Sequence, residues 1–194
     1  MELPKYLRKR RGLLELKNEG KWISWNAYHS KLSAYILGKG KNWPFKNKSR
    51  ILYLGAAEGN TISFLSRICD HGEIIAVDNS EIAMSELVSL AEKKTNIIPF
   101  LGDAHFPEKY QVYSRNPDIL YQDIAQNDQV EIFVRNYRFF NPICGYLMIK
   151  SRSISRNDKN VFDKIENTLK KEFNIIEIID IKKWAKGHRA YYIE

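Results

Sequence analysis

The stretch ILYLGAAEGNT, residues 51–61, ends a short apolar run with two glycines four positions apart. Gly55 and Gly59 would let the backbone come close to a ligand, and the free N–H groups at the start of a following helix favour negative charge. This arrangement predicts a site for a nucleotide-type ligand. Because the glycine spacing alone is weakly specific, a tight connection between a strand and a helix is the alternative interpretation.

Acidic residues stand at the ends of the next two apolar runs. Asp78 ends EIIAVD about 20 residues after the glycine turn, where an acidic side chain accepts hydrogen bonds from a ribose. Asp103, in LGDAH, ends the following run and is expected to meet an adenine amino group. Ala57 stands where a dinucleotide fingerprint has the glycine that lets the backbone approach a pyrophosphate. Because S-adenosylmethionine has no phosphate, Ala57 favours S-adenosylmethionine over NAD as the cofactor.

A sheet must bring these residues together. From residue 50 onward, short apolar runs alternate with segments of helical period, as in strands and helices that build a parallel sheet. The short segment between the last two runs predicts an antiparallel pair, and Pro99 predicts an edge position for the third strand. The expected strands are residues 50–55, 73–78, 96–102, 118–123, 146–151, 173–180 and 188–194, and the expected helices are residues 61–69, 80–94, 128–140 and a last helix with Val161, Ile165 and Leu169.

The pattern as a whole predicts an α/β fold. A seven-stranded, mostly parallel sheet with an antiparallel edge strand is the layout of Rossmann-like class I S-adenosylmethionine-dependent methyltransferases. Before residue 50, residues 1–24 are expected to form a short basic extension, mobile up to about residue 20. Residues 26–37 have helical period, ended by Gly38 and Gly40. Since no repeat or low-complexity linker interrupts the chain, residues 25–194 are expected to be one methyltransferase domain.

The charge of the chain favours a polyanionic partner. Its 194 residues include 31 lysines and arginines against 23 aspartates and glutamates, a net charge of +8. The surplus is grouped in KYLRKRR, KGKNWPFKNKSR, SRSISRNDK and KKWAKGHR, which favours RNA through the release of counterions. A solvated, lysine-rich surface is an equally weighted alternative.

Composition also bears on compartment and metal binding. No apolar run approaches the roughly 20 residues that span a bilayer, and the N-terminus lacks the apolar core of a signal peptide. Neither Cys69 nor Cys144 has a Cys or His at metal-ligand spacing, so both are expected to be reduced core residues and no metal site is expected. A cytoplasmic protein without a membrane partner is therefore expected.

Four segments, LYLGAAEGNT, KKTNIIPFLGDA, DIAQNDQ and MIKS, resemble fibrillarin, and most closely its archaeal form. Fibrillarin is the methyltransferase subunit of box C/D guide-RNA particles, and the resemblance extends from about Trp25 to the C-terminus. It implies S-adenosylmethionine-dependent 2′-O-methylation of rRNA, with tRNA as a further candidate substrate. The implied partners are box C/D guide RNA, target rRNA, a Nop-domain scaffold protein and, indirectly, a kink-turn-binding protein. The archaeal likeness implies the cytoplasm, and a nucleolar location would apply only to a eukaryotic source.

The resemblance also implies a catalytic set. The family positions a ribose hydroxyl with a Lys-Asp-Lys-His set, which corresponds here to Lys31, Asp123, Lys150 and His188. Lys150 is the candidate for orienting or deprotonating the hydroxyl, and the charge of Lys31 is expected to lower the pKa of Lys150. Asp123 is expected to position this pair and face the sulfonium, and His188 to hydrogen-bond to the substrate. Alignment of the methyl group with the hydroxyl is expected to supply much of the rate.

A cofactor set follows from the same resemblance. Its members are Gly55, Ala56, Gly59, Asn60, Thr61, Asp78, Asn79, Asp103, Ala104, Asp123 and Gln126. The sequence departs from the family at Glu58, Asn60, Asp78, Asn79 and Gly102, where the family usually has Ser, Thr, Glu, an aromatic residue and an acid. The family's N-terminal β-rich subdomain is expected to be reduced to the basic extension.

Three other functions remain open on the sequence. The chain could be a guide-independent methyltransferase of rRNA or tRNA, or a non-catalytic subunit of an RNA–protein particle. An NAD-dependent oxidoreductase is disfavoured by Ala57 and by the lack of a hydride-transfer set. The remaining histidines, His29, His71 and His105, are expected to be surface residues.

Overall fold

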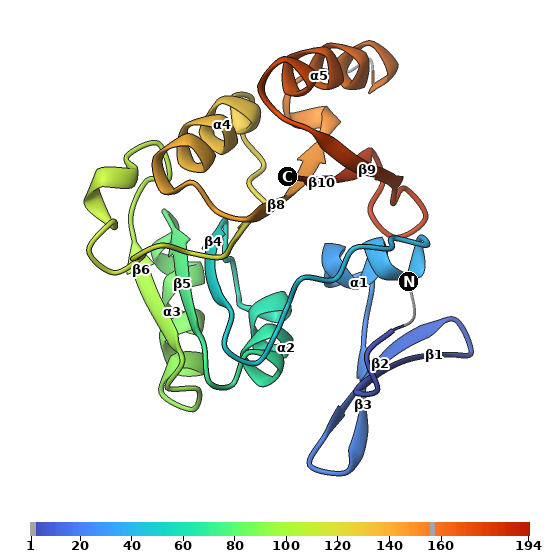
Figure 1. Ribbon diagram of the computed structural model, residues 1–194, viewed down its shortest axis with the longest axis vertical. Coiled ribbons are helices and arrows are strands. Elements are labelled where there is room, and N and C mark those ends of the chain that lie inside the picture. The colour runs from blue at the N-terminus through green and yellow to red at the C-terminus, as the bar shows by residue number, and fades with distance from the viewer. Residues whose placement is uncertain (1–2, 156–157) are drawn as a thin grey trace.

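A computed structural model describes residues 3–155 and 158–194. Its larger sheet has seven strands in the spatial order β6 (Ile97–Leu101), β5 (Glu73–Asp78), β4 (Arg50–Leu54), β7 (Ile119–Gln122), β8 (Cys144–Lys150), β10 (His188–Ile193) and β9 (Ile175–Asp180) (Figure 1). The first five strands run parallel, whereas β10 is antiparallel to both β8 and β9. The predicted sheet is therefore confirmed, including the edge position of the strand that contains Pro99.

Helices cover both faces of this sheet. Successive side chains of β4 point to opposite faces, so Ile51 and Tyr53 enter one core cluster and Leu52 and Leu54 enter another. The first cluster lies under α1 (Lys31–Leu37), α2 (Asn60–Ile68) and α3 (Glu81–Ala91), and the second lies under α4 (Gln129–Phe140) and α5 (Asp158–Glu172) (Figure 1). Two short 3₁₀ turns, η1 (Pro107–Lys109) and η2 (Ser151–Ser153), complete the described elements.

Serine caps fix where two of these helices begin. Ser80 Oγ accepts a hydrogen bond from the Ala83 N–H at 3.3 Å and starts α3. Ser30 is the N-cap of α1, so that helix begins at Lys31 rather than at residue 26 as expected from its period. The preceding residues turn instead, because the Asn26 side chain accepts the Tyr28 N–H at 2.9 Å. Lys31 is thereby the first residue of α1, so its side chain can extend away from the end of the helix.

The mobile extension expected for residues 1–24 is wrong for the part that the structure describes, since residues 1–2 lie outside it. β1 (Leu7–Arg10), β2 (Leu13–Asn18) and β3 (Lys21–Trp25) form a three-stranded antiparallel sheet. Two-residue turns join these strands, and both residues of each turn have positive φ: 50° and 75° at Arg11 and Gly12, 49° and 81° at Glu19 and Gly20. Such turns match the twist of a β-hairpin, so the glycines fix the strand pairing despite the high charge.

The small sheet packs on the larger α/β unit. Leu14 and Leu16 point inward from β2 and are fully or almost fully buried. Trp25, at the end of β3, stacks on Phe64 of α2 with ring centroids 4.6 Å apart and an interplanar angle of 4°. These side chains belong to the same core cluster as α1 and α2. A β-rich N-terminal unit is thus retained, contrary to the expected reduction to an arm.

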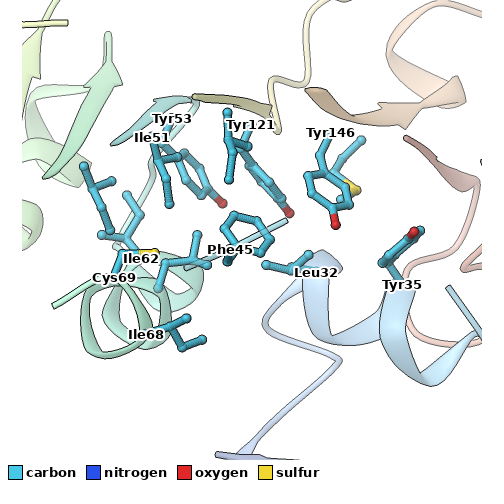
Figure 2. Packing of buried hydrophobic residues seen from close by; sticks show 14 of the residues in the cluster. Leu32, Tyr35, Phe45, Ile51, Tyr53, Ile62, Ile68, Cys69, Tyr121 and Tyr146 are labelled. Carbon is cyan, nitrogen blue, oxygen red and sulfur yellow. The ribbon is translucent and has the colours of Figure 1, made fainter. Parts of the chain in front are cut away.

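A row of tyrosines supports the sheet below the ends of its central strands. Tyr53, Tyr121 and Tyr146 come from the neighbouring strands β4, β7 and β8 and lie side by side (Figure 2). Their ring centroids are 4.5 and 5.9 Å apart, and burial raises the pKa of all three hydroxyls. The rings form a rigid, uncharged layer under the carboxyl ends of β4 and β7.

Two further findings concern the described residues alone. None of their helices is long and apolar enough to cross a bilayer. Cys69 and Cys144 are both buried and unpaired, and burial raises the pKa of both thiols. The expected core position of the two cysteines is confirmed.

Candidate functional site: a cavity at the strand ends beside a lysine–aspartate pair

The glycine turn joins β4 to α2 under a tight packing constraint. Gly55 has φ of 78°, and a Cβ at this position would lie 2.5 Å from the carbonyl oxygen of Asp123. Gly59 has φ of 77°, and its Cβ would lie 2.8 Å from Leu90 Cδ2. Both glycines therefore serve a close strand-to-helix connection, and Gly55 also lets the turn approach the segment that follows β7.

A cavity of about 260 Å³ opens at the carboxyl ends of β4, β5, β6 and β7. This is the edge at which open parallel sheets bind ligands. It is lined by Gly55, Ala57, Val77, Asp78, Asn79, Gly102, Ala104, Asp123, Ile124, Ala125 and Gln126.

The structure divides the expected cofactor residues into two groups. Gly55, Asp78, Asn79, Ala104, Asp123 and Gln126 line the cavity, whereas Ala56, Gly59, Asn60, Thr61 and Asp103 do not. Thr61 instead shares a hydrogen bond of 2.9 Å with Ser30, and Asp103 bonds to His105. Ala57, Val77, Gly102, Ile124 and Ala125 were missing from the expected set because their contribution is position and apolar surface rather than a reactive group.

Asp78 shapes the turn and keeps acceptor capacity for a ligand. Its Oδ2 accepts the Ala57 N–H at 2.8 Å and its Oδ1 accepts the Ser80 N–H at 2.9 Å. An ionised carboxylate has about four acceptor positions, so each oxygen can take a further hydrogen bond. A carboxylate held at the end of the second strand fits the hydroxyls of a ribose.

The charge of the lining discriminates between two cofactor classes. In the described part of the chain, Asp78 and Asp123 are the charged residues of the lining, and no lysine or arginine belongs to it. A dinucleotide would bring two negative phosphates to these carboxylates. S-adenosylmethionine has a positively charged sulfur instead, so the residues present fit S-adenosylmethionine and oppose NAD.

A lysine–aspartate ion pair lies beside this cavity, since Asp123 belongs to the lining and Lys31 does not. Lys31 Nζ, from the first residue of α1, is 2.7 Å from Asp123 Oδ2, just beyond the end of β7. The two side chains are 26% and 18% exposed, so water screens the pair only in part. The contact joins residues 31 and 123, which no local pattern of the sequence brings together.

Lys150 and His188 complete the expected catalytic set. They face each other as directly paired residues of β8 and β10. Burial lowers the pKa of His188, and the positive charges of Lys31 and Lys150 lower it further. His188 is therefore close enough to Lys31, Asp123 and Lys150 for the charge of each to act on its ring. Lys150 makes no ion pair with any residue that the structure describes.

His188 is held in one tautomer. Its Nδ1 lies 3.0 Å from the carbonyl oxygen of Lys186. A carbonyl only accepts, so Nδ1 carries the proton and donates it. With its pKa lowered, the ring is neutral at neutral pH and its Nε2 is an acceptor. The backbone contact is therefore compatible with a role toward substrate, because it orients the ring.

Comparison with known proteins decides the family. A family model described as Fibrillarin matches residues 10–194. The chain belongs to the fibrillarin family. It is 40% identical over 183 residues to a fibrillarin-like rRNA/tRNA 2′-O-methyltransferase of Saccharolobus islandicus, covering 89% of this chain and 78% of the relative.

Solved fibrillarin structures share the whole fold. A fibrillarin in complex with Nop5p superposes with a TM-score of 0.91 at 32% identity, covering 100% of this chain and 99% of that one. Aeropyrum pernix fibrillarin, solved with natively bound S-adenosylmethionine, has a TM-score of 0.82 at 34% identity, covering 96% and 84%. The sheet is thus the class I methyltransferase sheet of fibrillarins.

Gln129 is a buried residue beside the cavity that was not among the expected site residues, although it belongs to one of the segments that resemble fibrillarin. It is the second glutamine of DIAQNDQ, the first residue of α4, and fully buried. Its Oε1 accepts the Lys150 N–H at 3.0 Å, and its Nε2 donates to the carbonyl oxygens of Gln126 at 2.6 Å and Lys150 at 3.3 Å. One amide thus fixes the main chain of Lys150 relative to the cavity wall.

Replacing Gln129 by methionine is expected to lower the free energy of unfolding by about 1–3 kcal/mol, because buried Lys150 and Gln126 groups lose their partner. Chemical denaturation measures this change. Gln111→Met is the matched control, since the side chain of the exposed Gln111 donates to the Glu108 carbonyl three residues away, and its effect is expected within about 0.5 kcal/mol. Equal stability of the two variants would contradict the role given to Gln129.

His105 is not the isolated surface residue expected from the sequence. Its Nδ1 lies 2.5 Å from Asp103 Oδ1 and its Nε2 lies 2.7 Å from Asp128 Oδ2. The ring therefore connects the segment after β6 to the residue that precedes α4. His29 has an exposed side chain, and His71 is exposed and pairs with its neighbour Asp70, in agreement with the expectation for both.

Proposed function

We propose that the chain is an S-adenosylmethionine-dependent RNA 2′-O-methyltransferase that acts on rRNA or tRNA as the catalytic subunit of a box C/D guide particle. The observation that carries this proposal is the Lys31–Asp123 ion pair, with Lys150 and His188 close by, beside a cavity without basic lining. The named function of the Saccharolobus islandicus relative, a fibrillarin-like rRNA/tRNA 2′-O-methyltransferase, supports it.

The residues of the site divide the work of holding a cofactor. Asp78 would hold the ribose, and the apolar surfaces of Ala57, Val77 and Ile124 would contact the adenine and its neighbours. Asp123 faces the cavity with its negative charge, which suits a sulfonium. S-adenosylmethionine supplies an electrophilic methyl group on that positively charged sulfur.

The other groups act on the RNA hydroxyl. Lys31 neutralises part of the charge on Asp123 and holds its carboxylate in place, with Nζ 2.7 Å from Asp123 Oδ2. His188 accepts a hydrogen bond from the RNA substrate at Nε2, because Nδ1 is committed to the Lys186 carbonyl. Lys150 orients the hydroxyl that is methylated and receives its single proton when its own amine is uncharged. Holding the hydroxyl in line with the methyl group lowers the entropy cost of the transfer.

A particle supplies what the site itself lacks. A guide RNA that pairs with the target would select the nucleotide, so the protein itself needs little readout of base sequence. The known complex of a related fibrillarin with Nop5p supports a Nop-domain scaffold as the direct partner. The net charge of +8 favours binding of the negatively charged guide and target RNA. A kink-turn-binding protein completes the proposed particle.

Calorimetric titration with S-adenosylmethionine, and with NAD alongside, tests cofactor use. Wild type is expected to bind S-adenosylmethionine alone, and Asp78→Ala to weaken binding about 10- to 100-fold through lost charged hydrogen bonds. Asp70→Ala is the matched control, because the exposed Asp70 pairs with its neighbour His71 and lies outside the cavity lining. Binding of NAD, or equal affinity in the two variants, would overturn the cofactor assignment.

Reconstitution tests the place in a particle. Methyl transfer to a target RNA is measured with a matching guide RNA, a mismatched guide RNA and no guide, each with the scaffold and kink-turn-binding proteins. Transfer only with the matching guide is expected. Transfer without a guide would identify a guide-independent enzyme, and cofactor binding without transfer under any condition would identify a non-catalytic subunit.

A further inference from the structure

His105 bridges two carboxylates on different elements. Asp103 follows β6 by two residues, and Asp128 is the N-cap of α4. The ring contacts Asp103 Oδ1 through Nδ1 at 2.5 Å and Asp128 Oδ2 through Nε2 at 2.7 Å. Both contacts are short, in the range of hydrogen bonds that involve charged groups.

Hydrogen-bond counting gives the protonation state of this ring. A neutral imidazole carries one N–H, whereas an ionised carboxylate only accepts. Asp103 is ionised, because the His105 backbone N–H at 2.9 Å, and then the ring and Lys109, lower its pKa. If both ring nitrogens are to donate to carboxylates, the ring must be imidazolium. With one proton removed, one nitrogen lone pair would face a carboxylate oxygen and that contact would become repulsive.

The bridge connects two walls of the cofactor cavity. Gly102 and Ala104, on either side of Asp103, form part of one wall. Ala125 and Gln126, shortly before Asp128, form part of the other. The distance between these walls sets the width of the cavity, so a bond between Asp103 and Asp128 through His105 holds the cavity at the width seen here.

We propose that His105 is a positioning residue that holds the two cavity walls together only while its ring carries two protons, so that affinity for S-adenosylmethionine depends on the protonation of this ring. The proposal rests on the proposed cofactor. It concerns neither the transferred methyl group nor the RNA, because the ring is absent from the cavity lining and acts through Asp103 and Asp128.

The charged groups around the ring give the direction of the pH dependence. They are Asp103 on its own loop, Asp128 at the N-cap of α4, Arg135 on α4, and Lys109 on η1. Arg135 donates to the His105 carbonyl oxygen at 2.8 Å and does not titrate in the usual range. Hydrogen bonds from the ring to Asp128 and then Asp103 raise the pKa of His105 above its ordinary value of 6.5.

A raised pKa has a definite consequence for affinity. The bridge is complete below pH 6.5 and is lost as the pH rises through the higher pKa of the folded state. Affinity for S-adenosylmethionine is therefore expected to fall as the solution becomes alkaline. The pKa of His188 is lowered from 6.5, so His188 changes charge below pH 6.5 whereas His105 does so above it. The two histidines of the site thus change charge in separate pH ranges.

The decisive variant is Asp128→Asn. An asparagine amide has nearly the shape of aspartate, but its NH₂ group can donate to an unprotonated ring nitrogen. The bridge then survives with a neutral ring, and affinity should not depend on the second proton. His105→Gln removes the bridge, because a single amide cannot reach both carboxylates in the geometry of the ring, and is expected to bind weakly at every pH.

Calorimetric titration with S-adenosylmethionine from pH 6 to pH 9 tests the proposal on the whole chain. The Kd of wild type is expected to rise at least about fivefold over this range, the lower end of typical couplings between linked sites. The Kd of Asp128→Asn is expected to change only as far as the cofactor itself titrates, so the ratio of the wild-type Kd to the Asp128→Asn Kd is expected to rise by that factor from pH 6 to pH 9. A ratio of the two Kd values that does not change with pH would overturn the role of His105 while leaving the cofactor assignment intact.

Nuclear magnetic resonance of the His105 ring, in the absence of cofactor, gives an independent result. The ring is expected to keep both protons to a higher pH in wild type than in Asp128→Asn, with His105→Gln used to assign its signals. Equal titration of the ring in the two proteins would overturn the bridge. Failure of wild type to bind S-adenosylmethionine at every pH would instead overturn the proposed function.

Discussion

Replacing Lys150 by alanine is expected to slow methyl transfer about 10²- to 10⁴-fold, the usual contribution of a positioned acid or base. Lys150 ends β8 opposite His188 and makes no ion pair with the described residues, so its amine is available to the substrate hydroxyl. Because Lys150 does not line the cofactor cavity, affinity for S-adenosylmethionine is expected to stay unchanged. Single-turnover methyl transfer in the reconstituted particle measures the rate, and calorimetry measures the affinity.

The control for this variant is Lys170→Ala. Lys170 is an exposed lysine of α5, so its loss removes the same charge without touching the site. Wild-type rates are expected for Lys170→Ala. Full methyl transfer by Lys150→Ala would refute the role of Lys150, and a parallel loss of cofactor affinity would show that Lys150 serves binding rather than the transfer step.

Replacing Gly55 by alanine is expected to lower the free energy of unfolding by about 3 kcal/mol. One part is the left-handed backbone, with φ of 78°, which is unfavourable for a residue with a Cβ. The other part is the overlap of that Cβ with the Asp123 carbonyl oxygen, 2.5 Å away, which is backbone and cannot rotate aside. Relief of the overlap displaces Asp123, so affinity for S-adenosylmethionine should fall as well.

Gly12→Ala separates the two parts. Gly12 has φ of 75°, close to that of Gly55, but a Cβ there would meet nothing within 4 Å. Its loss is therefore expected to be about 1–2 kcal/mol, from the backbone alone, with cofactor affinity unchanged. Chemical denaturation and calorimetric titration of both variants measure the difference. If Gly55→Ala were no less stable than Gly12→Ala, close approach to Asp123 would not be the reason for a glycine at this position.

The central sheet was predictable because its signals are local. Apolar runs alternate with helical periods from residue 50 onward. An interior strand hydrogen-bonds to a neighbour on each side, and Pro99 has no N–H to donate, which favours an edge strand. The structure accordingly places β6 at an edge and pairs β9 with β10 antiparallel. The ends of the same strands gave Gly55, Asp78 and Asp103 as candidates, and Gly55 and Asp78 line the cavity whereas Asp103 does not. Asp123, which the family resemblance implied, lines it as well.

What the sequence did not reveal depends on pairings in space. The charge of residues 1–24 suggested an extension. Gly12 and Gly20 nevertheless flank a segment in which Leu14 and Leu16 alternate with polar residues, and this pattern was a readable hairpin signal. His105 had no motif, because its partner Asp128 lies 23 positions away on another element. Lys31 was expected to act on Lys150, whereas the structure pairs it with Asp123; its influence on Lys150 stays a prediction.

The position of β10 has a consequence for synthesis on the ribosome. β10 is translated after every other strand that the structure describes, yet it lies between β8 and β9. Until it emerges, the nascent chain has five parallel strands, an open edge at β8 and no His188. Such an edge pairs readily with other chains, so it needs protection during translation. The insertion of β10 closes the edge and brings His188 opposite Lys150 in one event, so we expect an unfinished polypeptide to lack the complete set of candidate catalytic residues.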